Sequence, residues 1–420
     1  MPVTATGPGE PEQAVRSAFA PSPPARLGVA VSGGSDSLAL LLLLAGWAGQ
    51  GGPEILAVTV DHGLRPEAAA EAAMVAGRCA ALGIAHTVLR WQGWDGRGNL
   101  PAAARAARYR LIAAWARDRG VGQVALGHTA DDQAETVLMR LARGSGVDGL
   151  SGMETCRDSQ GINWVRPLLG QTRQALRDWL TARGESWVDD PTNDDPAYDR
   201  VRARQALRAL AGLGIEREGL IATAERMRRA RAVLDQAAAD LAGRAARIEA
   251  GDVILDRATF AAAAEETRHR LFARALNWVS GADYRPRFAA LEAGLERAEA
   301  GKRVTLHGCL VMPRAATLRV TREPAAVAGT VAPAGALWDG RWRLEGPAAT
   351  DAEIRALGEA GLAQCPDWRA TGLPRPTLLS SPALWRSGQL LAAPVAGMGN
   401  GWVAILTRRP EEFVLSLFVH

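Results

Sequence analysis

A strand-like run followed by a glycine-rich loop carries the strongest signal in this chain: Leu27-Gly28-Val29-Ala30-Val31, then Ser32-Gly33-Gly34-Ser35-Asp36-Ser37. The loop leads into the apolar segment Ser37–Ala48, which we predict to be a helix. Two glycines let the backbone turn tightly and point its N–H groups at an anion. Ser32 and Ser37 add hydroxyl donors, and a helix N-terminus adds partial positive charge. We therefore expect a cradle for a pyrophosphate group.

Asp36 lies inside this loop, where its carboxylate would repel phosphate unless a divalent cation bridged the two. The loop thus predicts Mg²⁺ beside the nucleotide. No GxxxxGK(S/T) motif occurs, and the single lysine, Lys302, is far away in the sequence, which excludes a Walker-type nucleotide site. The alternative is a glycine turn capped by Ser and Asp without a ligand, but the strand–loop–helix context favours the nucleotide.

Short apolar runs alternate with longer amphipathic ones from residue 27 to residue 144. The predicted strands are Leu27–Val31, Ile55–Val60, Ile84–Leu89 and Gln123–Leu126, and the predicted helices are Ser37–Ala48, Glu67–Leu82, Ala102–Arg119 and Asp131–Arg143. This alternation predicts an α/β fold, a parallel sheet with helices on both faces. Ligands of such sheets bind beyond the carboxyl ends of the strands, where the polar motifs of this chain fall.

The rest of the chain divides by composition. We predict, in chain order, a disordered leader, a catalytic domain, a mainly helical domain, a linker and a small mixed or β-rich C-terminal domain: residues 1–25, 26–211, 212–322, 323–336 and 337–420. The helical domain is expected to close with a hairpin over Val304–Arg322.

The composition excludes several classes of protein. With 49 basic and 45 acidic residues the net charge is +4, which permits nucleic-acid binding without requiring it. The longest apolar run, Leu38–Ala48, is shorter than the roughly 20 residues of a membrane span, and the leader lacks a signal-peptide pattern. A zinc ribbon, an iron–sulfur cluster or a disulfide framework is not expected, because the four cysteines stand far apart: Cys79, Cys156, Cys309 and Cys365. We expect a soluble, cytoplasmic protein, and the sequence does not decide between a monomer and a homodimer.

Two further polar motifs follow predicted strands. Asp61 and His62 come after the second strand, where they either reach a nucleotide or cap the strand end. Gly127-His128-Thr129-Ala130-Asp131-Asp132 follows the fourth strand and opens a helix. Carboxylates are favoured at any helix N-terminus, yet a histidine with two acids at this edge also suits metal and phosphate chemistry. On the preceding helix, Arg105 and Arg108 share a face that can meet an anion.

The order and spacing of these motifs over residues 27–205 resemble the tRNA(Ile)-lysidine synthetase family of PP-loop ATP pyrophosphatases. The resemblance rests on SGGSDS (32–37), VDHGLRPE (60–67), Asn99 with Arg105, Arg108 and Tyr109, GHTADDQAET (127–136), RGSGVDGLSGM (143–153), VRPLL (165–169), DDPTN (189–193) and YDR (198–200). Two positions depart from the family pattern, with Pro101 in place of Glu and Val201 in place of Asn.

The resemblance implies an ATP-dependent ligase that adenylates the wobble cytidine of tRNA(Ile) with a CAU anticodon and then joins free L-lysine to its C2 atom. It implies that ATP is bound by Ser32, Gly33, Gly34, Ser35, Asp36, Ser37, Val60, Asp61 and Gly127, and that Mg²⁺ is held by Asp36 and Asp132. The implied catalytic residues are Asp36, Asp132, Arg108, His128 and Arg200.

The tRNA is expected to contact basic residues outside the nucleotide loop. Between Pro196 and Leu234 arginines outnumber acids, and we predict tRNA contacts from Arg105, Arg226, Arg228, Arg229 and Arg231. A solvated helix face is the alternative, and the codon usage of a GC-rich genome also explains the arginine content. The C-terminal domain is expected to bind tRNA as well. Its tryptophans either stack on bases or form its core: Trp338, Trp342, Trp368, Trp385 and Trp402.

Three other functions compete with this interpretation. A PP-loop tRNA thiolase needs reactive cysteines or a cluster, which four scattered cysteines do not provide. A small-molecule ligase such as an NAD or GMP synthetase uses the same loop without the other motifs. A non-catalytic nucleotide-binding module would not need Asp36, Asp132 and the arginines together, and release of pyrophosphate from ATP would distinguish it.

Overall fold

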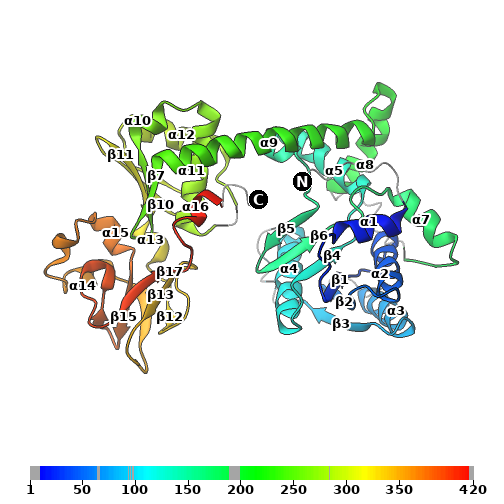
Figure 1. Cartoon of the computed structure of the whole chain (residues 1–420), viewed down its shortest axis with the longest axis horizontal. Coiled ribbons are helices and arrows are strands. Elements are labelled where there is room, and N and C mark those ends of the chain that lie inside the picture. Colours follow the sequence, from blue (N-terminus) through cyan, green and yellow to red (C-terminus); the bar gives the residue numbers. More distant parts are fainter. Residues whose placement is uncertain are drawn as a thin grey trace. The chain divides into compact units, whose positions relative to one another are not determined.

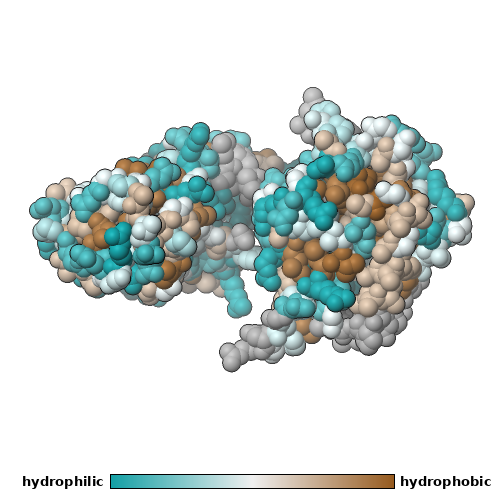
Figure 2. All heavy atoms as spheres, turned by 90° about the horizontal axis from the view of Figure 1, so that it is seen from below, coloured by the Kyte–Doolittle hydropathy of each residue, from teal (hydrophilic) through white to brown (hydrophobic). Residues whose placement is uncertain are grey.

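The computed structural model describes residues 10–63, 67–92, 94, 96, 99–188, 199–282 and 284–415. The chain divides between Arg231 and Ala232 into two compact units, each with its own sheets and hydrophobic cores (Figure 1). Hydrophilic residues are spread over both units on the face shown in Figure 2, and hydrophobic residues form smaller, separate areas. Among the described residues no helix is long and apolar enough to cross a membrane.

The first unit is built on a six-stranded sheet with the order β3-β2-β1-β4-β6-β5. Neighbouring strands are parallel, except that β5 runs antiparallel to β6. The strands are β1 (Arg26–Ala30), β2 (Glu54–Asp61), β3 (Ala85–Arg90), β4 (Gln123–Leu126), β5 (Cys156–Ser159) and β6 (Ile162–Val165). The four predicted strands are confirmed, and the carboxyl ends of β2, β1 and β4 meet at one edge.

Helices cover both faces of this sheet, as predicted (Figure 1). On one face, α2 (Ser35–Ala48), α3 (Glu67–Ala81) and α7 (Arg173–Thr181) share a core with Leu27 and Val29 of β1. On the other face, α4 (Leu100–Asp118) packs against Ala30 of β1 and its neighbours. Successive side chains of a strand point to opposite faces, so β1 contributes to both cores. The other helices of this unit are α1 (Pro11–Ala18), α5 (Ala130–Ala142), α6 (Val147–Leu150) and α8 (Asp199–Leu210), followed by a 3-10 turn, Ala211–Leu213.

The prediction of a disordered leader over residues 1–25 is wrong for the segment that forms α1. Val15 and Phe19 are buried in the core beside α2, and Phe19 stacks on Trp47. Glu12 accepts a hydrogen bond from the Trp179 indole at 2.7 Å. The short amphipathic helix α1 is therefore enough to pack this segment against α2, although its Ala- and Pro-rich composition resembles that of a linker.

The boundary that we predicted after residue 211 falls inside the first unit. Ala134 and Val137 of α5 form a small core with Leu220 and Ala224 of α9 (Arg217–Ala245). The N-terminal part of α9 thus packs with the catalytic domain, and the division between the units comes at Arg231.

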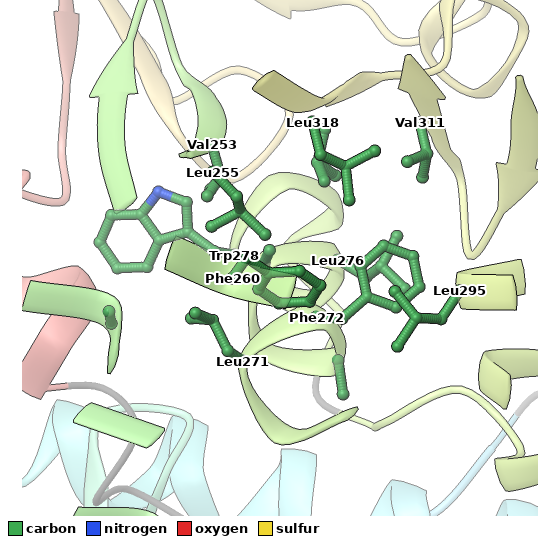
Figure 3. Close-up of a cluster of buried hydrophobic side chains, with 14 of the residues drawn as sticks. Val253, Leu255, Phe260, Leu271, Phe272, Leu276, Trp278, Leu295, Val311 and Leu318 are labelled. Atoms are coloured by element: carbon green, nitrogen blue, oxygen red, sulfur yellow. The ribbon is translucent and has the colours of Figure 1, made fainter. Parts of the chain in front are cut away.

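The first half of the second unit is an antiparallel sheet packed against helices. The order of its strands is β7-β8-β11-β10-β9. Their bounds are β7 (Ala246–Glu249), β8 (Asp252–Asp256), β9 (Val304–Leu306), β10 (Cys309–Pro313) and β11 (Thr317–Arg322), and the helices are α10 (Arg257–Ala261), α11 (Glu265–Ser280) and α12 (Phe288–Glu299). Figure 3 shows Phe272, Leu276 and Trp278 of α11 gathered with Val253 and Leu255 of β8 in the core.

The predicted helical domain over 212–322 is confirmed by the helices α9, α10, α11 and α12, but the region also contains this five-stranded sheet, which was not predicted. The predicted hairpin over Val304–Arg322 is a three-stranded meander of β9, β10 and β11. Strands β7 and β8 were not predicted from the sequence, because each is short and stands beside Ala- and Arg-rich helices.

The C-terminal part forms a four-stranded sheet, β12-β14-β15-β16, and a separate pair, β13-β17. The strands are β12 (Ala332–Pro333), β13 (Trp342–Glu345), β14 (Glu353–Ala356), β15 (Pro382–Arg386), β16 (Gln389–Ala392) and β17 (Val403–Leu406), and the helices are α13 (Pro324–Val327), α14 (Gly358–Leu362), α15 (Arg375–Leu379) and α16 (Glu412–Leu415), with 3-10 turns at Trp368–Thr371 and Pro394–Ala396. The predicted mixed architecture is confirmed. The predicted linker over 323–336 is instead part of the fold, because Val327 and Ala332 are buried in its core.

The tryptophans of the C-terminal part belong to its cores. Trp338, Trp342 and Trp385 are buried, and Trp368 and Trp402 pack against the same clusters. Core packing, the alternative to base stacking, thus accounts for all five.

A buried polar network joins the two parts of the second unit. Asp252 accepts hydrogen bonds from Arg319 Nη1 at 2.8 Å and Thr377 Oγ1 at 2.6 Å. Nearby, Asp339 receives the guanidinium groups of Arg322 (3.0 Å) and Arg341 (3.1 Å). Each buried carboxylate thus has charged or hydroxyl donors.

Candidate active site

The loop between β1 and α2 has the geometry of an anion cradle. Gly33 has a φ of +89°, a backbone conformation that favours glycine. Gly34 is the N-cap of α2 and has no side chain, so the first N–H groups of the helix carry no side-chain cap. The Ser37 hydroxyl closes the loop, since it accepts from Ser32 N and donates to Gly34 O, both at 3.1 Å. The loop therefore has the strand–turn–helix geometry expected of an anion cradle, and its use for a pyrophosphate stays a prediction.

One guanidinium group joins the acid of this loop to the acids of α5. Arg173, the first residue of α7, donates from Nε to Asp36 Oδ2 at 3.0 Å and from Nη2 to Asp132 Oδ1 at 3.4 Å. Its Nη1 lies 3.7 Å from Glu135 Oε1. Its backbone N–H also donates to Asp131 Oδ2 at 2.7 Å. Arg173 thus brings together carboxylates from two helices at the carboxyl edge of the sheet.

Asp132 is held in place by the start of its own helix. Its Oδ2 accepts from the backbone N–H of Thr129 at 2.9 Å, and Thr129 Oγ1 in turn accepts from the Asp132 N–H, which makes a capping box. The other oxygen, Oδ1, faces Arg173 and also Arg200 Nη1 at 3.3 Å. Capping therefore uses one oxygen, and the second oxygen is directed into the site.

The three carboxylates of the site titrate differently. Burial raises the pKa of Asp36, and attraction by Arg173 opposes this rise. Burial also acts on Asp132, but attraction by Arg200, His128 and Arg173 outweighs it and lowers the pKa of Asp132. Burial and then repulsion by Asp132 raise the pKa of Glu135, although Arg204 Nε donates to its Oε1 at 3.0 Å. Asp132 is therefore the most firmly ionised, and Glu135 holds a proton more readily.

Arg108 lies near His128, and only Arg108 carries charge near pH 7. Burial, reinforced by repulsion from nearby arginines, lowers the pKa of His128 to about 3, so its imidazole is neutral near pH 7. Burial first, and then repulsion by Arg105 and Arg200, lowers the pKa of the Arg108 guanidinium. Arg108 forms no ion pair with any described residue, which leaves its guanidinium group for an anionic ligand.

Gly127, at the end of β4, lets this segment approach the loop at backbone distance. A Cβ atom at this position would lie 3.0 Å from Asp36 O and 3.0 Å from both Cα and N of Ser37. These neighbours are backbone atoms of a helix start and cannot turn aside as a side chain could. Gly127 is therefore required by the spacing between the nucleotide loop and the segment that carries His128 and Asp132.

Comparison with known proteins agrees with this geometry. A family model described as a PP-loop domain matches residues 10–210. A tRNA(Ile)-lysidine synthase of Ruegeria pomeroyi is 48% identical over 410 residues, which cover 97% of each chain. Another, from a Bradyrhizobium strain, is 41% identical over 71% of this chain and 90% of its own length. The chain belongs to the tRNA(Ile)-lysidine synthase family. It is accordingly an ATP-using ligase with a PP-loop domain.

A solved structure, the U34-tRNA thiolase NcsA from Methanococcus maripaludis, aligns with a TM-score of 0.46 and 17% identity, over 52% of this chain and 78% of that chain. This likeness is too low to bear on function. The cysteines of the present chain are all free, and Cys79, Cys309 and Cys365 are buried while Cys156 is exposed. They lie in different parts of the fold (α3, β5, β10 and the segment after α14), unlike the reactive pair or cluster that we would expect for sulfur transfer.

The remaining positions of the lysidine synthase pattern are placed as follows. Val60 and Asp61 end β2, and Asp61 Oδ1 accepts from Gly63 N at 2.8 Å, so it caps the strand end. His62 packs edge-on against Trp91. The motif at 189–193 and Tyr198 lie outside the described residues.

The two departures from the family pattern have structural roles. Pro101 stands in the first turn of α4, where proline fits, behind the Asn99 cap. Val201 is a buried residue of α8.

The arginines that we predicted to bind tRNA separate into two groups. Arg226 and Arg229 are exposed on α9. Arg228 is half-buried and approaches Ser151 O at 3.5 Å, and Arg231 pairs with Glu154. Arg105 is exposed on α4 and lies over the ring of Tyr109. A solvated helix face therefore describes Arg226 and Arg229 but not Arg228 and Arg231.

Several residues of this site were missed by the sequence analysis. Arg173 and Glu135 complete the ion-pair network, and Arg204 of α8 binds Glu135. The same side chains border a cleft of about 460 Å³ between α5, α7, α8 and the start of α9. Glu135 lies in the GHTADDQAET motif, one turn after Asp131, and this spacing could have identified it. Arg173 follows the helix cap Thr172, and no local pattern distinguishes it.

Proposed function

We propose that this chain activates the wobble cytidine of tRNA(Ile) with a CAU anticodon and joins L-lysine to its C2 atom. The C2 oxygen attacks the α-phosphate of ATP and pyrophosphate leaves. The ε-amine of lysine then displaces AMP from C2, which gives lysidine. The observation that supports this most is the meeting of Asp36 and Asp132 at Arg173, beside an uncapped helix N-terminus, in a chain of the lysidine synthase family.

In the first step, negative charge moves onto the departing pyrophosphate. The N–H groups at the start of α2 and the loop between Ser32 and Ser37 face this charge with preorganised dipoles. Arg108 has no carboxylate partner among the described residues and supplies positive charge from the other side of the sheet edge. The assignment of these groups to ATP is part of the proposal.

Mg²⁺ fits the donor set of this site. Asp36 and Asp132 offer carboxylate oxygens that both face the guanidinium group of Arg173, and Mg²⁺ commonly takes one or two carboxylates with water and phosphate. The described residues hold no larger cluster of metal-binding side chains. Arg173 now bridges the two carboxylates, so it would have to share or give up these oxygens. When bound, the cation would neutralise charge on the phosphates.

The second step needs a neutral amine, and Glu135 is the best placed base. Its pKa is raised by burial, which makes its carboxylate a better proton acceptor, and its Oε2 has no hydrogen-bond partner among the described residues. His128 is a weak base because its pKa is about 3. Asp132 is also a weak base, because its pKa is lowered. We assign Glu135 to the amine proton and His128 to a neutral hydrogen-bonding role. A cytoplasmic location, where tRNA, ATP and free lysine occur together, belongs to the same proposal.

The experiment is incorporation of radiolabelled lysine into tRNA(Ile) with a CAU anticodon, in the presence of ATP and Mg²⁺. Label in RNA, with one AMP released per lysine, is expected. Asp132→Ala and Arg108→Ala should lower kcat by about 10²-fold or more, since they act on groups that change charge in the transition state. Binding of tRNA without any label in RNA would reject the ligase reaction. A rise only in the KM for tRNA would move that residue to RNA docking.

A further inference from the structure

A group of arginines stands beside the catalytic residues without carboxylate partners. The arginine cluster consists of Arg105 on α4, Arg140 on α5, Arg157 on β5 and Arg166 just after β6. In the described part of the chain none of these four forms an ion pair. Burial lowers the pKa values of Arg140 and Arg166 first. Repulsion by Arg231 lowers that of Arg140 next, and repulsion by Arg105 and Arg157 lowers both pKa values further.

Arg166 is the most buried member, with 7% of its surface exposed. Its Nη1 donates to Glu154 O at 2.8 Å, but its Nε has no hydrogen-bond partner among the described residues. The Nε of Arg157 is likewise buried and without a partner. Burying guanidinium groups in this state is costly unless an anion compensates them. Neither atom is used by the catalytic arrangement derived above.

Glu154, an acid close to Arg140 of this cluster, is already occupied. Glu154 pairs with Arg231 and also attracts Arg140, whose Nη1 is held by Gly149 O and Gly152 O at 2.9 Å. Glu154 is thus engaged by Arg231, and no ion pair of the described residues neutralises the four arginines of the cluster.

The cluster adjoins the site but is separate from the nucleotide loop. Arg166 repels a proton on His128, which places it close to that ring. Arg105 donates to the Tyr109 hydroxyl at 3.4 Å, and Arg166 hydrogen-bonds the same hydroxyl. In the sheet, β6 lies two strands from β1, roughly 10 Å at the usual strand spacing. The loop after β1 already has its own anion cradle.

We propose that the arginine cluster binds phosphodiester groups of the RNA strand next to the cytidine that is being modified. This proposal rests on the proposed function, because it takes tRNA as the substrate of the neighbouring site. Guanidinium groups suit phosphate oxygens, which they can bind in bidentate fashion. The contact is to the backbone, so it positions the strand and does not read its sequence.

The test compares two double variants of the full chain. Arg105→Gln with Arg157→Gln removes the more accessible half of the cluster and spares the buried Arg166, whose loss could unfold the protein. The control, Arg110→Gln with Arg119→Gln, removes two exposed arginines from α4 and its end that lie outside the cluster. Binding of the tRNA is measured at several salt concentrations, together with KM for tRNA, KM for ATP and kcat.

We expect the cluster variant to bind tRNA roughly tenfold more weakly near physiological salt. The slope of log K against log salt should decrease by about 1.4, at about 0.7 per contact with single-stranded RNA. KM for tRNA should rise, while KM for ATP and kcat at saturating tRNA stay unchanged. Arg105→Lys, which keeps the charge, should largely retain the slope, and the control variant should match the wild type.

Two results would overturn the docking site. One is an unchanged salt slope in the cluster variant. The other is a rise in KM for ATP without one for tRNA, which would assign the arginines to the nucleotide pocket. The proposed function fails separately, when the wild-type chain binds tRNA but incorporates no lysine, and the comparison of salt slopes can still be made in that case.

Discussion

The two units of this protein contain buried charge networks of opposite character. In the second unit, Asp252 and Asp339 are each surrounded by donors, and none of their buried oxygens lacks a partner among the described residues. In the first unit, Asp36, Asp132 and Glu135 all face the guanidinium of Arg173, with Arg200 also on Asp132 and Arg204 also on Glu135. Even so, Glu135 Oε2 and His128 Nδ1 have no hydrogen-bond partner among the described residues.

The difference indicates what each network is for. A network in which every buried charge has a partner fixes the packing of the segments that it joins. Removal of one partner would leave a buried charge unpaired, which is strongly destabilising. An unsaturated network keeps its desolvated groups ready for a ligand, at a cost in stability. We therefore expect substitutions in the first network to affect catalysis and substitutions in the second to affect folding.

The largest effect is expected for Asp36→Ala. AMP formation should fall by about 10³-fold or more, because this carboxylate lies in the phosphate cradle and is the loop's acid for the cation. The affinity for tRNA should stay close to that of the wild type, and thermal unfolding should show an intact fold. Near-normal turnover would remove the argument for a metal bridge at this position.

Asp252→Ala should reverse this pattern. It leaves Arg319 and Thr377 without their buried acceptor, so the free energy of unfolding of the second unit should decrease by roughly 3 kcal/mol. Chemical denaturation measures this loss. The control is Asp240→Ala, which changes an exposed carboxylate of α9. At a temperature where the variant is folded, kcat should match the wild type. A loss of kcat without a loss of stability would show that the second network also serves catalysis.

A smaller change, in pH dependence, is expected for Arg173→Met. Arg173 lowers the pKa of Asp36 against the raising effect of burial, so its removal should raise that pKa further. As the pH falls, Asp36 then becomes protonated earlier, and the acid limb of kcat/KM should move to higher pH. Arg173→Lys should restore part of the shift, and Arg183→Met, just beyond the same helix, should not move the limb. An acid limb that stays in place would separate Asp36 from the titrating group.

The sequence predicted those features that depend on local pattern. The four parallel strands and the helices after them were found because apolar runs and glycine turns mark them directly. The loop of residues 32–37, Asp36 and Asp132 were predicted to lie at this edge for the same reason, since each stands next to a strand end, and the structure brings both acids to Arg173. Their roles toward ATP and Mg²⁺ stay predictions. Gly127 was predicted to bind ATP. Its backbone also lies so close to the nucleotide loop that a side chain would not fit, and this steric limit already explains why a glycine stands there.

The features that were missed depend on distant contacts. Arg173 lies 137 positions from Asp36, and its role appears only when α7 packs beside α2. The short helix α1 becomes stable by burying Val15 and Phe19, which composition alone does not reveal. The inward turn of Arg228 and Arg231 likewise follows from the packing of α9 on α5. Tertiary contacts, and not local propensity, determined each of these features.

Because the backbone at Gly127 lies so close to the start of α2, even the single methyl group of an alanine side chain would press against that helix. An alanine there would push the start of α2 away from the strand end that leads to His128 and Asp132. Asp36 on one side and His128 with Asp132 on the other would then move apart, although none of these side chains had been changed. The separation of the two acids is therefore built into the main chain, and enzyme engineering that aims to retune this site has to work from the helices around it and leave this position as it is.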